Sequence, residues 1–102
     1  MFARNVSIHL KSNMLSDYTR TFEKDVLPLL RKQNGFKDEI TFSSPGGTDV
    51  TAISLWDNKA NAEAYNNNIY PDVVKTLARV MDGTPQVQSG EVVNSTIHQA
   101  TA

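Results

Sequence analysis

The sequence predicts an α+β protein in which two helices cover one face of a four-stranded antiparallel sheet. Three patterns support this fold class. Residues 2–10 alternate between apolar and other side chains, residues 15–30 and 62–81 repeat apolar residues at helical spacing, and residues 36–56 read as strand, turn and strand. A chain of 102 residues suits one domain with one core, so we expect residues 1–102 to form a single domain.

The first strand and the first helix follow directly from these periods. One face of the strand carries Val6, Ile8 and Leu10, and the other carries Ala3, Asn5, Ser7 and His9. The helix that follows has an apolar stripe from Leu15 to Leu30 and ends at Asn34-Gly35, a usual C-terminal signal. Pro28 lies inside this stripe and lacks an N–H, so it predicts a kink or local break.

The second half of the chain supplies a hairpin, a helix and a last strand. The run "FKDEITF", the turn formers "SSPGGT" and the run "VTAISLW" predict the hairpin. Asp57 or Asn58 is expected to cap the next helix, which Pro71 restarts. The last strand is predicted over 85–95, with a bulge at Gly90, and the tail from about 95 to 102 as mobile or as an added edge strand. The order β-α-β-β-α-β is the split βαβ, or ferredoxin-like, arrangement.

Composition excludes several classes of function. Ten basic residues against eleven acidic ones give no basic footprint for nucleic acid. No cysteine is present, and the two histidines and the acidic residues show no metal-ligand spacing, so we expect neither a metal nor a cofactor. No apolar run is long enough to span a bilayer, and no leader pattern begins the chain, so we expect a cytoplasmic protein without a membrane partner.

The functional prediction depends on which side chains lie on the face of the sheet that the helices leave uncovered. We expect the helices to pack on the face that carries Val6, Ile8, Leu10, Ile53 and Leu55. The other face would then hold the following side chains: Ala3, Asn5, Ser7, His9, Ala52, Ser54 and Trp56. An exposed tryptophan on a bare sheet favours association. A second copy packed on this face would make a homodimer, with a pocket between sheet and helices or between the two sheets.

At this point the sequence resembles a known family. The stretches "FARNV", "LPLLRKQNGF" and "ISLWDNKANAEAY", with the order of elements, are similar to the antibiotic biosynthesis monooxygenase family of dimeric α+β barrel proteins, over residues 2 to about 94. The resemblance implies a homodimer that binds a planar aromatic substrate in an apolar cavity, often without metal or flavin. Fold likeness alone leaves the activity open, because the family also includes haem-degrading enzymes.

Each branch of the family implies particular residues. Haem-degrading members have an asparagine on the first strand, which Asn5 matches, but Lys75 stands where their histidine would be. Polyketide-oxidising members have a tryptophan, which Trp56 matches, but Ala52 replaces the asparagine four residues earlier. Many quinol-oxidising members have a histidine at the position of Tyr65, whose phenol is a poor base at neutral pH.

Asn5, Trp56, Tyr65 and His9 are therefore the candidate catalytic residues. Each has a structural alternative: Trp56 as dimer packing, Asn5 as a backbone partner, Tyr65 as core and His9 as a solvated rim residue. The favoured function is a cofactor-independent monooxygenase, or a related small oxidoreductase, acting on a reduced aromatic or quinol-like substrate. The alternatives are a non-catalytic dimeric module that binds an apolar small molecule, and a dimer without a cavity.

Overall fold

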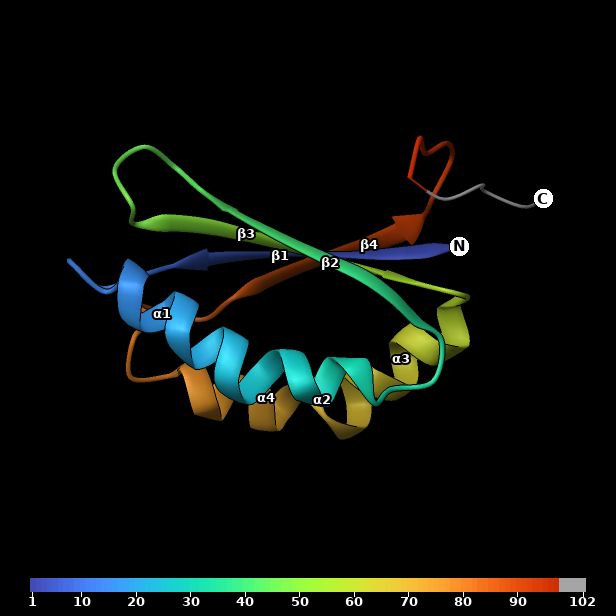
Figure 1. The fold of residues 1–102 in the computed structure, drawn as a ribbon, viewed down its shortest axis with the longest axis horizontal. Coiled ribbons are helices and arrows are strands. Elements are labelled where there is room, and N and C mark those ends of the chain that lie inside the picture. Colours follow the sequence, from blue (N-terminus) through green and yellow to red (C-terminus); the bar gives the residue numbers. More distant parts are fainter. Residues whose placement is uncertain (98–102) are drawn as a thin grey trace.

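The structure, a computed structural model, describes residues 1–97. It has two layers, a twisted sheet and a layer of helices that covers only one face of that sheet (Figure 1). The N-terminus lies at the same end of the molecule as the end of the last strand (Figure 1). Within residues 1–97, none of the helices combines the length and the apolar character that crossing a bilayer requires.

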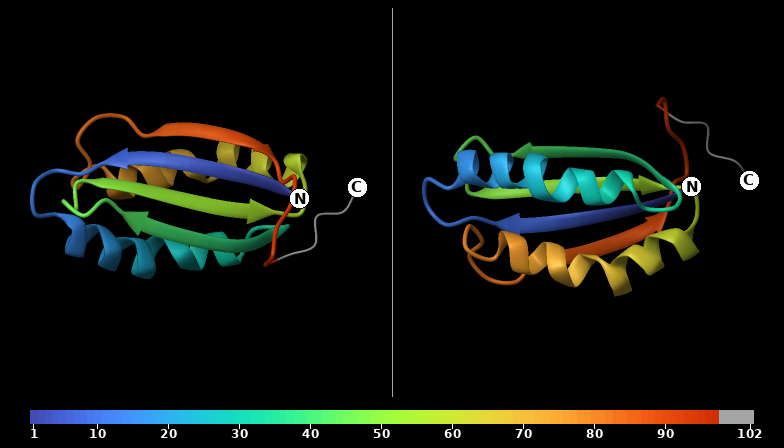
Figure 2. Two further views of the ribbon diagram at one scale, coloured as in Figure 1. Left: turned by 90° about the horizontal axis from the view of Figure 1, so that it is seen from above. Right: turned by 60° about the horizontal axis from the view of Figure 1, so that its bottom comes forward.

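The sheet contains four antiparallel strands in the order β2-β3-β1-β4. Strand β1 spans Phe2–His9, β2 spans Phe36–Ser43, β3 spans Asp49–Trp56 and β4 spans Gln86–Glu91. Seen from the uncovered side, the strands lie side by side with all helices behind them (Figure 2). The predicted α+β, ferredoxin-like fold class is confirmed.

The first helical row runs through three consecutive segments: α1 (Leu15–Thr21), η1 (Phe22–Val26) and α2 (Leu27–Arg31). The segment η1 is a π-helical turn, in which the Leu27 N–H donates to the Phe22 carbonyl five residues earlier. This wider turn ends two residues before Pro28, whose missing N–H removes one bond from the helical ladder. The predicted local irregularity at Pro28 is present, and it takes the form of a π turn.

The second helical row consists of α3 (Lys59–Asn68) and α4 (Tyr70–Leu77). Asn58 caps α3 by accepting a hydrogen bond from the Asn61 backbone N–H at 2.9 Å, as one of the two predicted caps. Pro71 lies in the first turn of α4, where its missing N–H leaves no helical bond unmade. The predicted restart at Pro71 is therefore confirmed.

The C-terminal part differs from the prediction. Strand β4 ends at Glu91, and residues 92–97 form no strand. The register across Gly90 is regular, so the predicted bulge there is wrong, and the irregularity lies between Phe36 and Asp38 on β2 instead. Part of the tail prediction falls on residues 98–102, which lie outside the described residues.

The two faces of β3 are the reverse of the prediction. Strand register pairs Phe2 with Trp56 and Val6 with Ala52, so Trp56 shares the face of β1 that the helices cover. Ile53 and Leu55 lie on the helix-free face, where they remain only partly buried. The predicted assignment of Trp56 to the open face is wrong, because the even-numbered residues of β3 continue the covered face of β1.

The open face also carries two large, exposed apolar side chains. Phe42 is 56% exposed and Ile40 is 60% exposed, both on edge strand β2. Their register partners on β3 are Thr51 and Ile53. The face without helices is thus apolar at its β2 side, although the indole is absent from it.

Candidate functional site

The four predicted site residues fall on opposite faces of the sheet. Trp56 and Tyr65 meet on the helix side, with ring centroids 5.1 Å apart. Asn5 pairs with Ile53 in the register, and His9 pairs with Asp49, so both belong to the helix-free face. A sheet backbone separates the two pairs, and they do not converge on one site.

Trp56 is a core residue in this arrangement. Its side chain is fully buried, and its indole N–H donates to the Ser54 hydroxyl at 2.9 Å. The ring of Phe36 meets it edge-on at 5.5 Å. A buried indole with its N–H satisfied in this way needs no ligand to complete it.

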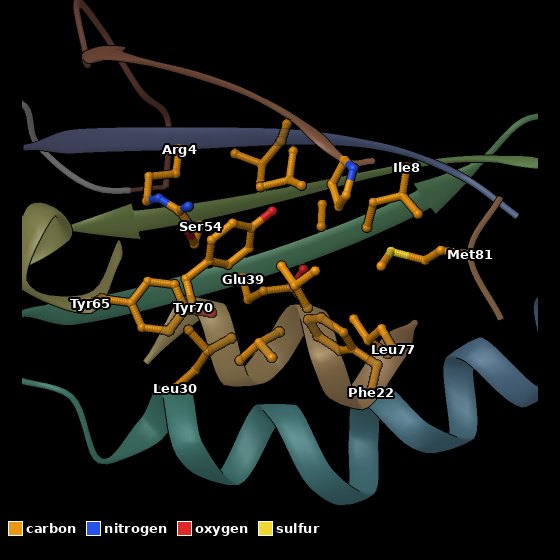
Figure 3. A pocket seen from close by; sticks show the side chains of 16 residues that line it. Arg4, Ile8, Phe22, Leu30, Glu39, Ser54, Tyr65, Tyr70, Leu77 and Met81 are labelled. Carbon is orange, nitrogen blue, oxygen red and sulfur yellow. The ribbon is translucent and has the colours of Figure 1, made fainter. Parts of the chain in front are cut away.

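A pocket lies beside this aromatic cluster, between the covered face of the sheet and the helices (Figure 3). Its volume is about 40 Å³. Strand residues such as Val6 and Ile8 and helix residues such as Phe22 and Leu77 make most of the wall apolar. The polar side chains in the lining are Arg4, Glu39, Ser54, Tyr65 and Tyr70.

Arg4 is the most unusual member of this lining. It is only 4% exposed, on the strand face that otherwise carries Phe2, Val6 and Ile8. Its guanidinium lies 5.0 Å from the centre of the Tyr65 ring and 4.5 Å from that of Tyr70, which is cation–π distance.

The guanidinium has a neutral hydrogen-bond partner and no carboxylate partner. Arg4 Nη2 donates to Asn66 Oδ1 at 2.8 Å. The ion pairs within 4.0 Å among residues 1–97 do not include Arg4. Burial lowers the pKa of Arg4 from its ordinary value, against the smaller opposing effects of Tyr65 and Tyr70. The pocket therefore contains a desolvated positive charge.

The two tyrosines of the pocket are not available as bases at neutral pH, because they stay protonated. Burial raises the pKa of Tyr65 to about 12, with the Arg4 charge acting in the opposite direction. Burial also raises the pKa of Tyr70, again against the Arg4 charge. The ring of Tyr70 reaches into the middle of the pocket in the close view (Figure 3). Both phenols are protonated at neutral pH and are therefore able to donate a hydrogen bond to a ligand.

Glu39 supplies the acidic group of the pocket. It lies on β2 opposite Ser54, which in turn lies opposite Arg4 on β1. Burial raises the pKa of Glu39 above its ordinary value, although a hydrogen bond from the Thr41 hydroxyl at 2.5 Å acts against this. Its side chain points toward the pocket (Figure 3).

A second, wider recess adjoins the pocket between α1, η1 and edge strand β2. Its volume is about 340 Å³, and its walls include Leu15, Tyr18 and Phe42. Phe22 and Glu39 line both spaces. The buried Phe22 ring therefore forms part of the partition between the small inner pocket and the larger outer recess.

On the helix-free face, the two remaining predicted residues have separate surroundings. Asn5 Oδ1 is buried and has no hydrogen-bond partner among residues 1–97. His9 Nδ1 lies 2.8 Å from Asp49 Oδ1, and the hydrogen bond to this carboxylate raises the pKa of His9. The described part of the chain contains no group of three His, Cys, Asp or Glu side chains suited to a metal.

Sequence reasoning missed Arg4 and Glu39. The signal for Arg4 was present, because the period of β1 places position 4 on the same face as Val6 and Ile8. An ionisable residue at an apolar-face position is a candidate for function. Glu39 had no comparable signal, because the alternation of β2 is short and its more apolar side, with Ile40 and Phe42, faces away from the helices.

Solved structures share this arrangement. A monooxygenase from Streptomyces coelicolor, from the gene ActVA-Orf6 and in complex with nanaomycin D, superposes with a TM-score of 0.75 at 16% identity, over 92% of each chain. SnoaB from Streptomyces nogalater, a cofactor-independent oxygenase, gives a TM-score of 0.77 at 8% identity, over 95% of this chain and 97% of its own. A protein of unknown function from Nitrosomonas europaea gives a TM-score of 0.72 at 16% identity, over 93% of this chain and 91% of its own.

This likeness to solved structures defines the fold of the chain. The chain has the fold of structures named antibiotic biosynthesis monooxygenases, as the sequence resemblance predicted. No protein-family model and no curated protein matches the chain.

Proposed function

We propose that the protein is a cofactor-independent monooxygenase that acts on a reduced aromatic or quinol-like substrate. The observation that carries the proposal is Arg4, a buried cation without a carboxylate partner in a pocket with mostly apolar and aromatic walls. The fold that the chain shares with a structure named a monooxygenase and with one named a cofactor-independent oxygenase supports it.

The reaction requires the protein mainly to bind the substrate and to stabilise its negative charge. A reduced aromatic that has lost a proton supplies its own electrons to oxygen, so the site must hold the ring, exclude water and stabilise the anion. A guanidinium in a poorly hydrated pocket stabilises an oxyanion more strongly than it would in water. In an anthrone-type substrate, the methylene would become a carbonyl with one oxygen atom, and the other would leave as water.

The ligand would enter through the outer recess. The inner pocket of about 40 Å³ has room for a few water molecules and not for an aromatic ring. Rotation of Phe22 would join it to the recess of about 340 Å³, and the joined space would lie near the lower end of the size range of ordinary ligand pockets. Phe22 begins the π-helical turn, a feature that is frequent at functional sites.

The open face of the sheet would be closed by a second copy of the chain. Ile40 and Phe42 are more than half exposed there, and the buried Asn5 Oδ1 on the same face has no partner among residues 1–97. Face-to-face packing of two such sheets buries the apolar side chains of both. We place the substrate inside each protomer, because the pocket lies on the helix side.

An oxygen-transfer assay tests the activity. Purified protein is incubated with anthrone or with naphthohydroquinones under isotopically labelled oxygen, and the product is analysed by mass spectrometry. We expect incorporation of label well above the rate of the same reaction without protein. Labelled product that forms no faster than in this blank across the whole panel would refute the monooxygenase proposal.

One observation favours the second candidate, a non-catalytic module that binds an apolar small molecule. The tyrosines of the pocket have raised pKa values and His9 lies on the other face of the sheet, so the predicted base is absent from the pocket. This alternative predicts that the same compounds raise the melting temperature without forming product, since a ligand that binds only the folded state stabilises it.

A further inference from the structure

Three polar side chains on neighbouring strands form a row across the sheet face that lines the pocket. Arg4 on β1 pairs with Ser54 on β3, and Ser54 pairs with Glu39 on β2. Neighbouring strands are about 4.8 Å apart, so the backbones at the two ends of the row are about 10 Å apart. A positive and an acidic group therefore line one pocket from β1 and β2, with Ser54 of β3 between them (Figure 3).

The two charged groups do not neutralise each other directly. Ion pairs closer than 4.0 Å in residues 1–97 involve neither Arg4 nor Glu39. Arg4 donates to Asn66, and Glu39 accepts from Thr41. Once rotation of Phe22 has joined the pocket to the outer recess, a ligand that reaches both groups can meet the Glu39 carboxylate at one edge and the Arg4 guanidinium at the other.

Glu39 is also placed to exchange protons with solvent. It is the one carboxylate in the lining of the inner pocket, and it lines the wider outer recess as well. Desolvation raises its pKa toward neutrality, which makes its carboxylate a stronger base than an exposed one. Burial raises the pKa values of Tyr65 and Tyr70, so both phenols stay protonated near pH 7 and neither acts as a base. His9 lies on the helix-free face of the sheet.

We propose that Glu39 is the general base of the pocket and that Arg4 holds the anion that Glu39 creates. This inference rests on the proposed function and assigns the residues that would perform its first step. A Glu39 oxygen takes a proton from an acidic C–H or O–H of the ligand, and the bonding electrons stay on the ligand. They delocalise through the ring onto an oxygen at the opposite edge, which accepts hydrogen bonds from the guanidinium.

The proposal defines the class of ligand. It is an aromatic with an acidic C–H or O–H at one edge and a carbonyl or hydroxyl oxygen at the other. Ligands with only one of these groups would contact one end of the row and make no hydrogen bond at the other, which weakens binding.

Other ionisable groups surround Glu39. Those that line the same spaces as Glu39 or interact with it are Arg4 (β1), Tyr18 (α1), Glu23 (η1), Arg31 (α2), Lys37 and Asp38 (β2), Tyr65 (α3) and Tyr70 (α4). The raised tyrosine pKa values keep the phenols neutral near pH 7. Glu39 and the ligand are then the groups that change charge within the inner pocket.

Proton removal can be measured without oxygen. Anthrone is incubated anaerobically in deuterated buffer with the protein, and uptake of deuterium at its methylene is followed by mass spectrometry. We expect the wild-type protein to accelerate exchange, and Glu39→Gln to lose at least about a hundredfold of that acceleration. Glu91→Gln, a glutamate on the exposed strand β4, is the matched control and keeps the wild-type rate.

Binding and pH dependence separate a lost base from a damaged pocket. Trp56 is the only tryptophan and contacts Tyr65 of the pocket wall, so its fluorescence reports binding of anthrone. Glu39→Gln should still bind. The wild-type exchange rate should fall as pH falls through the raised pKa of Glu39, because protonation removes the base, and Glu39→Gln should lack this acidic limb.

The outcomes distinguish this inference from the monooxygenase proposal. Exchange that depends on Glu39, without incorporation of labelled oxygen, supports the base and removes the monooxygenase. Oxygen incorporation at the wild-type rate in Glu39→Gln removes the base and leaves the monooxygenase. Absence of exchange with the wild-type protein, or full exchange with Glu39→Gln, overturns the assignment of Glu39.

Discussion

Arg4 is a residue whose location favours function over stability. Its guanidinium is desolvated beneath the helices, and it is held by Asn66 and by the faces of Tyr65 and Tyr70. A carboxylate would compensate the desolvation more fully, but none lies within ion-pair distance among residues 1–97. A buried charge whose desolvation is incompletely compensated is typical of residues that serve binding or catalysis.

Replacing Arg4 by methionine should therefore not destabilise the fold. The change keeps an unbranched side chain and removes the buried charge, so we expect the free energy of unfolding to stay equal or to rise by about 1 kcal/mol. Urea denaturation measures it. The control is Arg20→Met at an exposed helical position, with a change within about 0.5 kcal/mol. A loss above about 2 kcal/mol for Arg4→Met would show that the tyrosine contacts outweigh the desolvation.

His9 should make stability depend on pH. Its hydrogen bond to Asp49 raises the pKa of His9 above 6.5 in the folded protein, so the folded state holds the proton more tightly than the unfolded state. This contribution is complete below pH 6.5 and is lost as pH rises through the raised pKa. Thermal melts of the wild type and of His9→Gln at a series of pH values should differ most on the acidic side, and a constant difference would contradict the assignment.

At the scale of elements, the junction between α2 and β2 fixes how the two helical rows meet. Gly35 follows α2 with φ of +78°, and its carbonyl accepts a hydrogen bond from the Asp57 N–H at 2.7 Å. An added Cβ there would lie 2.1 Å from Asn61 Nδ2 and 2.9 Å from Asn61 Cβ on α3. Only glycine satisfies both the backbone conformation and the close approach of the helix.

A series of three glycine variants separates these two requirements. Gly35→Ala should destabilise by about 3 kcal/mol, with about 1 from the left-handed backbone and about 2 from the clash. Gly83→Ala, at φ of +89° in open space, should lose only about 1 kcal/mol. Gly46→Ala, without positive φ and with nothing within 4 Å, should be nearly neutral. Chemical denaturation gives all three values, and equal losses for Gly35 and Gly83 would exclude the clash.

At the scale of the whole molecule, the two faces of the sheet have different roles. The covered face holds the core and the pocket, and the uncovered face presents Ile40 and Phe42 to solvent. An edge strand that exposes large apolar side chains favours association. The proposed dimer would remove both side chains from water while leaving the pocket within each protomer.

Charge on this face should prevent self-association. The double substitution Ile40→Lys and Phe42→Lys would place like charges opposite each other in the proposed dimer, so we expect monomers in sedimentation velocity where the wild type forms dimers. Val93→Lys is the matched control, because Val93 is 88% exposed and lies outside the strands. A wild-type protein that sediments as a monomer at every concentration would remove the dimer proposal.

Prediction from sequence succeeded where a local period had one interpretation. Strand β1 has one apolar and one small or polar face, so its covered side was assigned correctly. Strand β3 carries apolar residues in both phases, with Ile53 and Leu55 in one and Ala52 and Trp56 in the other. Local periodicity does not choose between two such phases, and the hydrophobicity of Ile53 and Leu55 indicated the wrong one.

The sequence by itself determined the order of the elements, a cap at Asp57 or Asn58, the breaks at Pro28 and Pro71, and the fold class, because these depend on neighbours within a few residues. Only the tertiary structure decided which residues form the pocket. Pairing of β1 with β3 aligned Arg4 with Ser54 and turned Trp56 under the helices, and pairing with β2 brought Glu39 to the other end of the row. Strand register acts between segments far apart in the chain, so no local pattern contains it.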